Sequence, residues 1–272
     1  MANKYTPYEQ LKFSDDYMFK SVMIRENICR RVLERILGER VREIKFHEAE
    51  KSVKNSLPCK GVRLDVYLWN DTTAYDIEMQ TKAELAIGRR ARYYQSSMDM
   101  DSLKSGEDYQ QLKEGIVIFI CLEDPFQRGI SRYTFRERCE EAQDLDPKIG
   151  TRKIFLYANG NADQETEEMR RFLDYLRDGL VPEEDELIRD IEDAVQFERQ
   201  DTRGKEIYRG VSMPIVDAEN RTTIRINTQS IMHLMHAHGM TFDEAADFLG
   251  LKKLDRENCR TVIEKEEQQP SN

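Results

Sequence analysis

The chain has 272 residues, a formal net charge of −10, 39% hydrophobic side chains and 35% charged ones. This length predicts one or two domains with a sizeable core, and no apolar run approaches the roughly 18–20 residues that a membrane span requires. Five scattered cysteines without a CxxC pair argue against a disulfide framework and against a zinc knuckle. The acidic balance is unusual for a dedicated DNA-binding protein, although it is compatible with a local basic groove.

Helices and strands are predicted to alternate over the first part of the chain. Apolar side chains recur at helical spacing over residues 14–37 until Gly38, which predicts a helix. Residues 41–48 form a strand or an extended link, and a loop over 49–60 leads into a β-hairpin over 61–80. The remaining elements complete a mixed α/β core of about 155 residues: a helix over 82–104 and strands over 115–122, 133–138 and 153–157.

The rest of the chain is predicted to be mainly helical. The expected helices cover residues 165–178, 183–199, 228–238, 242–249 and 255–265. Residues 200–227 are polar and are expected to be irregular. Gly239 and Gly250 each follow a short helix in the position that favours glycine. Thr241 and Glu244 fit a capping box at the start of the helix between them.

The predicted division into domains follows from this change of pattern. We expect a core over 1–160, a helical extension packing on it over 161–215, and a small helical module with a polar tail over 216–272. A helix-turn-helix is one interpretation of the module, but its last helix mixes acidic and basic side chains, so a dimerisation or interaction module is at least as well supported. His233, His236 and His238 are favourable near a helix C-terminus through the helix dipole, and a metal pair is the less favoured alternative.

The hairpin over residues 61–80 contains the candidate catalytic residues. Asn70–Thr73 is a turn signal, and if Asp71 and Thr72 are the turn residues, opposed positions add up to 143. Asp65 then lies directly opposite Glu78, and Gln80 points to the same face of the hairpin. Two facing carboxylates repel each other unless a cation bridges them, and hard divalent cations prefer carboxylate oxygens.

An outward-facing, solvated strand is the alternative interpretation of these charges. Three features favour a functional site: aromatic neighbours (Tyr67 and Trp69), an apolar opposite face, and a following helix that contains Arg89, Arg90 and Arg92. An acidic centre beside a basic flank is what the cleavage of a polyanion requires.

At these residues the chain resembles the PD-(D/E)XK nuclease superfamily, and more closely the bacterial recombination-promoting nuclease (Rpn) and transposase family. The resemblance spans roughly residues 13–215 and is specific in the order and spacing of its motifs. The segments that carry it are DYMFK from Asp16, RLDV from Arg63, IEMQ from Ile77, RARYY from Arg90, GEDY from Gly106 and VIFICLEDPF from Val117.

The resemblance implies a restriction-endonuclease-like αβββαβ core with a mixed sheet, followed here by a helical C-terminal region. It further implies metal-dependent endonuclease activity on DNA. Asp65 matches the metal-binding aspartate, Glu78 matches the acidic residue of (D/E)XK, and Gln80 stands where the superfamily usually has lysine. A further acidic ligand is expected near the first helix: Asp16 is the candidate, an acid beside a helix dipole is the alternative, and Glu48 and Glu50 are weaker candidates.

We therefore expect a Mg²⁺-dependent DNA endonuclease, with Mn²⁺ as a substitute ion, no organic cofactor, no membrane partner, a cytoplasmic location and a homodimer as one option. Arg90 and Arg92 are predicted to contact phosphates and Tyr93 to stack on bases, whereas Tyr94 is expected in the core. A solvated helix face is the alternative for both arginines. The rival interpretation of the whole chain is a catalytically silent DNA- or protein-binding module, because glutamine cannot supply the charge of lysine.

Overall fold

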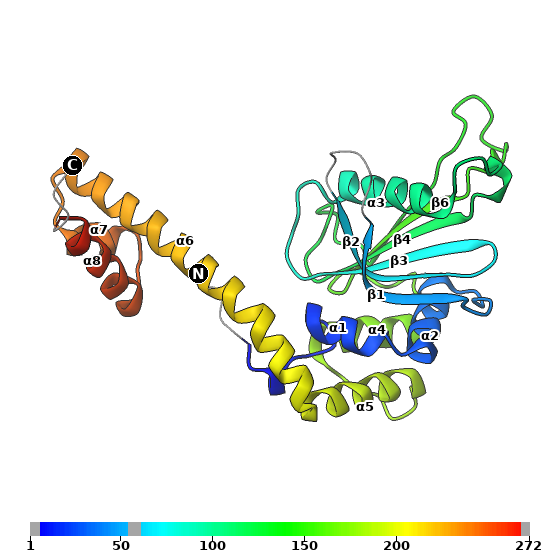
Figure 1. The fold of residues 1–272 in the computed structure, drawn as a ribbon, viewed down its shortest axis with the longest axis horizontal. Coiled ribbons are helices and arrows are strands. Elements are labelled where there is room, and N and C mark those ends of the chain that lie inside the picture. Colours follow the sequence, from blue (N-terminus) through cyan, green and yellow to red (C-terminus); the bar gives the residue numbers. More distant parts are fainter. Residues whose placement is uncertain (1–5, 54–60, 268–272) are drawn as a thin grey trace. The chain divides into compact units, whose positions relative to one another are not determined.

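The computed structural model describes residues 6–53 and 61–267, and within them six strands form one mixed sheet in the order β1-β2-β3-β4-β6-β5 (Figure 1). The chain divides into two compact units. One unit is Glu9–Asp201 and contains the sheet, and the other consists of Met1–Tyr8 and Thr202–Asn272. The predicted domain limits at 160 and 215 stay predictions.

The sheet combines an antiparallel half with a parallel centre. Its strands are β1 (Phe46–Val53), β2 (Val62–Trp69), β3 (Thr73–Gln80), β4 (Glu114–Cys121), β5 (Arg132–Phe135) and β6 (Thr151–Tyr157). The first three strands are antiparallel neighbours, β3 and β4 are parallel, β4 and β6 are parallel, and β5 closes the edge in the antiparallel sense. The α/β class and the αβββαβ order predicted from the sequence are confirmed.

Helices cover both faces of this sheet. One face carries α3 (Ile87–Ser102), and the other carries α1 (Asp16–Met23), α2 (Glu26–Leu37) and α4 (Glu167–Asp178) (Figure 1). The helix α5 (Glu186–Gln200) packs on α1 and α2, on their side away from the sheet. Two ion pairs connect α2 and its N-cap residue with α5 and its N-cap residue: Arg35 contacts Asp185 at 2.7 Å, and Arg25 contacts Glu198 at 2.6 Å. Strands buried on both faces explain why β4 is an apolar run without polar alternation.

Two N-terminal predictions need correction. The helix expected over 14–37 is two helices, because Arg25 adopts an extended conformation (φ −76°, ψ 104°) that ends α1 and caps α2. The loop expected over 49–60 is wrong for residues 49–53, which belong to β1. These residues form a strand because all of them except Glu50 pair with β2, so tertiary pairing outweighs the weak strand propensity of the segment. Residues 54–60 lie outside the described residues, as does most of the predicted polar tail.

The largest error concerns residues 200–227, which were expected to be irregular. The helix α6 (Thr202–His238) runs through them and through the predicted helix 228–238. Two buried side chains near its ends support it: Tyr208 packs on Tyr8 with ring centroids 5.7 Å apart, and Ile231 is fully buried. Packing of this kind outweighs local propensity. No described helix, α6 included, is both long and apolar enough to cross a membrane.

A small core holds α7 (Phe242–Phe248) and α8 (Lys253–Glu267) against α6. The capping box of Thr241 and Glu244 is confirmed by both of its hydrogen bonds. Two arginines of α8 form ion pairs with α7, at 2.5 Å from Arg256 to Asp247 and at 2.8 Å from Arg260 to Asp243. These arginines are therefore engaged within the module.

Gly160 follows β6 at a point where two backbone segments meet. A Cβ atom built there would lie 2.5 Å from the carbonyl carbon of Ile130 and from the nitrogen of Ser131. We expect Gly160→Ala to lower the free energy of unfolding by about 1–3 kcal/mol, because the backbone has to shift. Urea denaturation measures this change. The control is Gly88→Ala in α3, where a Cβ atom meets nothing within 4 Å, so that an equal loss there would contradict the assignment.

Candidate active site

The hairpin of β2 and β3 has the predicted register. Its Cα partners run from Trp69 opposite Ala74 to Val66 opposite Ile77, and each pair of numbers adds up to 143. The turn is fixed by the side chain of Asn70, whose Oδ1 accepts hydrogen bonds from the backbone nitrogens of the two threonines that follow Asp71, at 3.0 and 2.9 Å. The predicted turn and register are therefore confirmed.

Beyond Val66 the regular pairing gives way to side-chain contacts. The backbone nitrogen of Asp65 donates to Oε1 of Glu78 at 2.8 Å, and the nitrogen of Met79 donates to Oδ2 of Asp65 at 3.3 Å. Each carboxylate thus binds a backbone N–H of the opposite strand. Asp65 is 7% exposed and Glu78 is 1% exposed, so the sheet holds both carboxylates in fixed positions inside the fold.

A buried lysine from α1 contacts Asp65 from one side. Nζ of Lys20 lies 3.1 Å from Oδ1 of Asp65, 2.8 Å from Oδ2 of Asp16 and 3.5 Å from Oε1 of Glu50. Burial lowers the pKa of Lys20, but the Asp65 and Asp16 carboxylates raise it above its ordinary value. Asp16, the predicted third ligand, is thus linked to Asp65 through Lys20, and its role as a ligand stays a prediction.

The backbone beside Asp65 is strained. Glu50 has a φ of 60°, a left-handed conformation that non-glycine residues rarely adopt. It lies in β1 between Ala49 and Lys51, which pair with the residues on either side of Asp65. Such strain is often found at functional sites. Glu48, the other weaker candidate, contacts Lys51 at 3.7 Å instead.

An arginine from α3 contacts Glu78 from the other side. Nη2 of Arg90 donates to Oε2 of Glu78 at 2.7 Å, and Nη1 donates to Oε1 of Gln80 at 2.9 Å. Nη1 also reaches Glu84 at 2.9 Å, and Nε donates to the hydroxyl of Tyr94 at 2.8 Å. The residue predicted to contact phosphate therefore directs its donors to protein groups, and its phosphate role stays a prediction.

Sequence reasoning missed a third acid of this cluster, Asp76. It is fully buried, and among the described residues neither of its carboxyl oxygens has a hydrogen-bond partner. Burial, followed by repulsion from Glu78 and Asp65, raises its pKa well above the ordinary range. The signal was present in the sequence, because Asp76 and Glu78 are two apart on one strand and share a face.

The cluster carries more acids than cations. Burial and the charge of Asp65 raise the pKa of Glu78 to about 8, although Arg90 pulls it down. Burial also raises the pKa of Asp65 despite the ammonium of Lys20. The three buried carboxyl groups share their two cations with Asp16, Glu50 and Glu84, so acids outnumber cations and the folded site retains protons near neutral pH.

The donor chemistry of this cluster fits a hard divalent cation. Carboxylate oxygens are the preferred ligands of such ions, and a bound cation would relieve the repulsion that raises the pKa of Glu78. Asp65 and Glu78 supply two carboxylates, and the described residues form no group of three or more His, Cys, Asp or Glu side chains able to hold a metal. Water and a substrate phosphate commonly complete such a coordination shell.

The remaining predicted residues lie on α3. Arg92 and Tyr93 are exposed, so their side chains are accessible to a nucleic acid, and these roles stay predictions. Tyr94 packs in the core as expected, with its ring centroid 6.1 Å from that of Phe119. Tyr67, a predicted aromatic flank of the site, is only 2% exposed and belongs to the core on the face that α3 covers.

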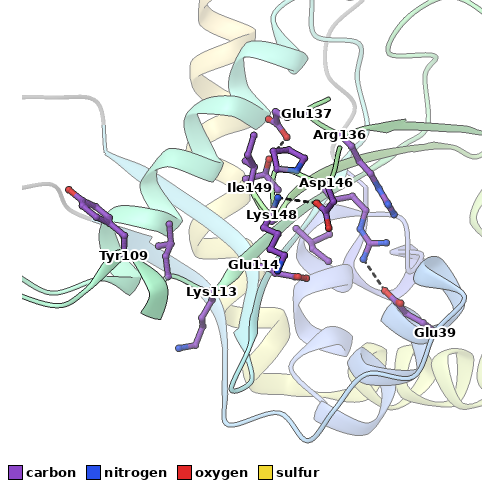
Figure 2. A pocket seen from close by; sticks show the side chains of 15 residues that line it. Glu39, Tyr109, Lys113, Glu114, Arg136, Glu137, Asp146, Lys148 and Ile149 are labelled. Carbon is purple, nitrogen blue, oxygen red and sulfur yellow. Dashed lines mark hydrogen bonds and ion pairs between the residues drawn. The ribbon is translucent and has the colours of Figure 1, made fainter. Parts of the chain in front are cut away.

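A polar pocket of about 650 Å³ lies at the opposite end of the sheet (Figure 2). Glu114 in its lining pairs with Thr73 at the start of β3, whereas Phe119 pairs with Glu78. Residues 114 and 119 are five apart, which corresponds to about 16 Å along a strand. The pocket is therefore distinct from the carboxylate pair. Its lining mixes both signs of charge, including the ion pair of Arg152 with Glu39.

The mixed sheet and the helices on its faces are consistent with an α/β fold of the PD-(D/E)XK type. Residues 13–143 match the family model described as PD-(D/E)XK nuclease family transposase. Neither the curated proteins nor the solved structures that were searched contain a match. The resemblance predicted from the sequence is therefore confirmed at the level of the family.

In the absence of divalent metal we expect the stability of the protein to fall as the pH rises. The folded-state pKa of Glu78 is about 8 against an ordinary 4.5, and that of Asp76 is raised as well. At a pH between the ordinary pKa and the folded-state pKa, the unfolded chain has released protons that the folded chain retains. The contribution of these protons to stability is therefore complete below the ordinary pKa values. It is lost as the pH rises through the folded-state pKa values.

Thermal unfolding in EDTA at about pH 6 and about pH 8.5 tests this expectation. Asp76→Asn and Glu78→Gln should each reduce the difference between the two melting temperatures. Glu168→Gln, at an exposed position of α4, is the matched control and should leave the difference unchanged. An unaltered difference in both site variants would show that these carboxyls do not retain protons in the folded state.

Proposed function

We propose that the chain is a metal-dependent DNA endonuclease that hydrolyses phosphodiester bonds. The observation that carries the proposal is the buried pair of Asp65 and Glu78, each held by a backbone N–H of the opposite strand. The match of residues 13–143 to a nuclease family model supports the same class of reaction. Fixed, partly uncompensated carboxylates are suited to holding Mg²⁺ or Mn²⁺.

The proposed roles follow from these positions. Asp65 and Glu78 hold the cation, and Asp16 is the candidate for a further oxygen ligand. When bound, a divalent cation lowers the pKa of a coordinated water and offsets negative charge on the reacting phosphate. Gln80 can orient water only through hydrogen bonds, because its side chain carries no charge. Arg92 and Tyr93 are exposed on α3 and are proposed to contact the phosphates and bases of DNA.

A catalytically silent binding module is the second candidate. Two observations favour it: Gln80 replaces the usual lysine, and Lys20 and Arg90 already engage both carboxylates. Under this alternative the two cations satisfy the site permanently, and no divalent metal is needed. The homodimer and the cytoplasmic location expected from the sequence stay predictions under both alternatives.

The first test is nicking of supercoiled plasmid by the purified full chain in Mg²⁺, Mn²⁺ or EDTA. We expect metal-dependent nicking that Asp65→Ala and Glu78→Ala each reduce by at least about 100-fold, because each removes a ligand of the reacting centre. Glu168→Ala in α4 is the control for the loss of a carboxylate far from the site. Nicking that survives in the Asp65 variant would contradict the assignment, whereas a folded but inactive wild-type chain would favour the silent module.

The second test uses the metal alone. We expect Mg²⁺ or Mn²⁺ to raise the melting temperature, and to do so more at about pH 8.5 than at about pH 6, because the cation competes with the protons retained by Glu78 and its neighbours. Asp65→Asn should abolish the shift. A shift of equal size in that variant would place the bound metal elsewhere, and the absence of a shift in the wild type would favour the silent module.

A further inference from the structure

Gln80 leaves this site without the cation that the third position of the (D/E)XK pattern normally supplies. A lysine there would project from β3, two residues beyond Glu78 and on the same face. In this chain the side-chain oxygen of Gln80 instead accepts a hydrogen bond from Arg90 at 2.9 Å, and its amide nitrogen donates to the carbonyl of Lys82 at 2.6 Å. The guanidinium of Arg90 therefore lies next to the place that the ammonium group of a lysine at position 80 would occupy.

The geometry points to Arg90 as the residue that supplies, from α3, the positive charge that a lysine at position 80 would supply from β3. This inference rests on the proposed nuclease function and deepens it. One guanidinium contacts both residues of the pattern, since Nη2 reaches Glu78 while Nη1 reaches Gln80. Arg90 is a positioning residue in this role: it fixes the carboxylate and the amide, and it adds a charge next to them.

The surroundings of Arg90 hold it in one place. Its guanidinium carbon lies 4.9 Å from the ring centroid of Tyr94 and 5.3 Å from that of Phe119, and Nε donates to the tyrosine hydroxyl. Contacts with two aromatic rings, together with hydrogen bonds from all three guanidinium nitrogens, restrict the rotamer. A charge fixed before the substrate arrives needs no rearrangement during the reaction.

Lys20 is the other cation of the site, and its position makes it a poorer replacement. Its ammonium lies within 4 Å of three carboxylates, those of Asp16, Glu50 and Asp65. Arg90 is itself shared between the carboxylates of Glu78 and Glu84, so the surrounding acids do not distinguish the two cations. Their positions do, because Lys20 contacts the aspartate side of the pair, whereas Arg90 contacts the Glu78 and Gln80 side.

The arrangement also accounts for glutamine at position 80. A lysine there would bring an ammonium group to the guanidinium that Gln80 now contacts at 2.9 Å, and two cations at such a distance repel each other. The amide oxygen of glutamine accepts the hydrogen bond instead. Positions 80 and 90 are therefore alternative sources of one charge, and moving the charge from one position to the other should restore part of the function that Arg90→Gln removes.

Four proteins test this exchange: the wild type, Arg90→Gln, Gln80→Lys, and the double variant Arg90→Gln/Gln80→Lys. We expect Arg90→Gln to reduce plasmid nicking by about 100-fold and the double variant to recover at least about tenfold of that loss. Gln80→Lys alone should nick no better than the wild type. Arg170→Gln, which removes the same charge from an exposed position of α4, is the matched control and should not change nicking.

Mn²⁺ binding, measured by calorimetry on the same proteins, separates a charge role from a purely structural one. If Arg90 supplies charge, Arg90→Gln binds Mn²⁺ at least as tightly as the wild type, because a neighbouring cation has been removed, and the double variant returns to the wild-type affinity. If Arg90 only holds Glu78 in place, affinity and nicking fall together in Arg90→Gln, and a lysine at position 80 restores neither.

The outcomes separate this inference from the proposed function. Wild-type nicking that persists undiminished in a folded Arg90→Gln variant would overturn the inference and leave the nuclease intact. A wild type that does not nick would overturn the proposed function, and the Mn²⁺ affinities would still decide the charge assignment. Melting temperatures in EDTA show whether each variant is folded, and if Arg90→Gln fails to fold, Arg90→Lys replaces it, with partial retention of nicking expected and full loss contradicting the charge role.

Discussion

The structure depends on one exchange of hydrogen bonds between β2 and β3. Asp65 and Glu78 lie where the next pair of the antiparallel ladder would be, and each accepts a hydrogen bond from the backbone of the opposite strand. Buried carboxylates are costly unless they are paired and hydrogen-bonded. The surrounding structure meets this need from both helical layers, with Lys20 from α1 on one side and Arg90 from α3 on the other.

The balance of charge links this geometry to function. Two cations stabilise the pair in the absence of metal, but Asp76 adds a third buried acid whose charge they do not offset. The site is therefore electrostatically strained, and protons or a divalent cation relieve the strain in different ways. The fold thus holds the proposed metal site in place before any ion binds. Glu50, beside Asp65, has a left-handed backbone conformation as well.

The hairpin could be predicted from the sequence because residues close together in the chain determine its strands and its turn. Alternating side chains set the faces of the strands, and Asn70 sets the turn, so the register that aligns Asp65 with Glu78 follows without tertiary information. The partners of these carboxylates could not be predicted in the same way. Lys20 is 45 residues before Asp65, and its contact depends on how α1 packs on the sheet. The long helix α6 was also missed, since its polar residues show no amphipathic pattern and its large buried side chains, Tyr208 and Ile231, lie near its ends.

The proposed nuclease function requires that one divalent cation at Asp65 and Glu78 serves the cleavage reaction. A single experiment compares two curves in one buffer: Mn²⁺ binding to the full chain, and plasmid nicking as a function of the Mn²⁺ concentration. We expect both curves to have the same midpoint and Asp65→Ala to abolish both. Nicking that saturates at a concentration unrelated to binding, or binding that survives in the Asp65 variant, would rule out a shared cation at this site.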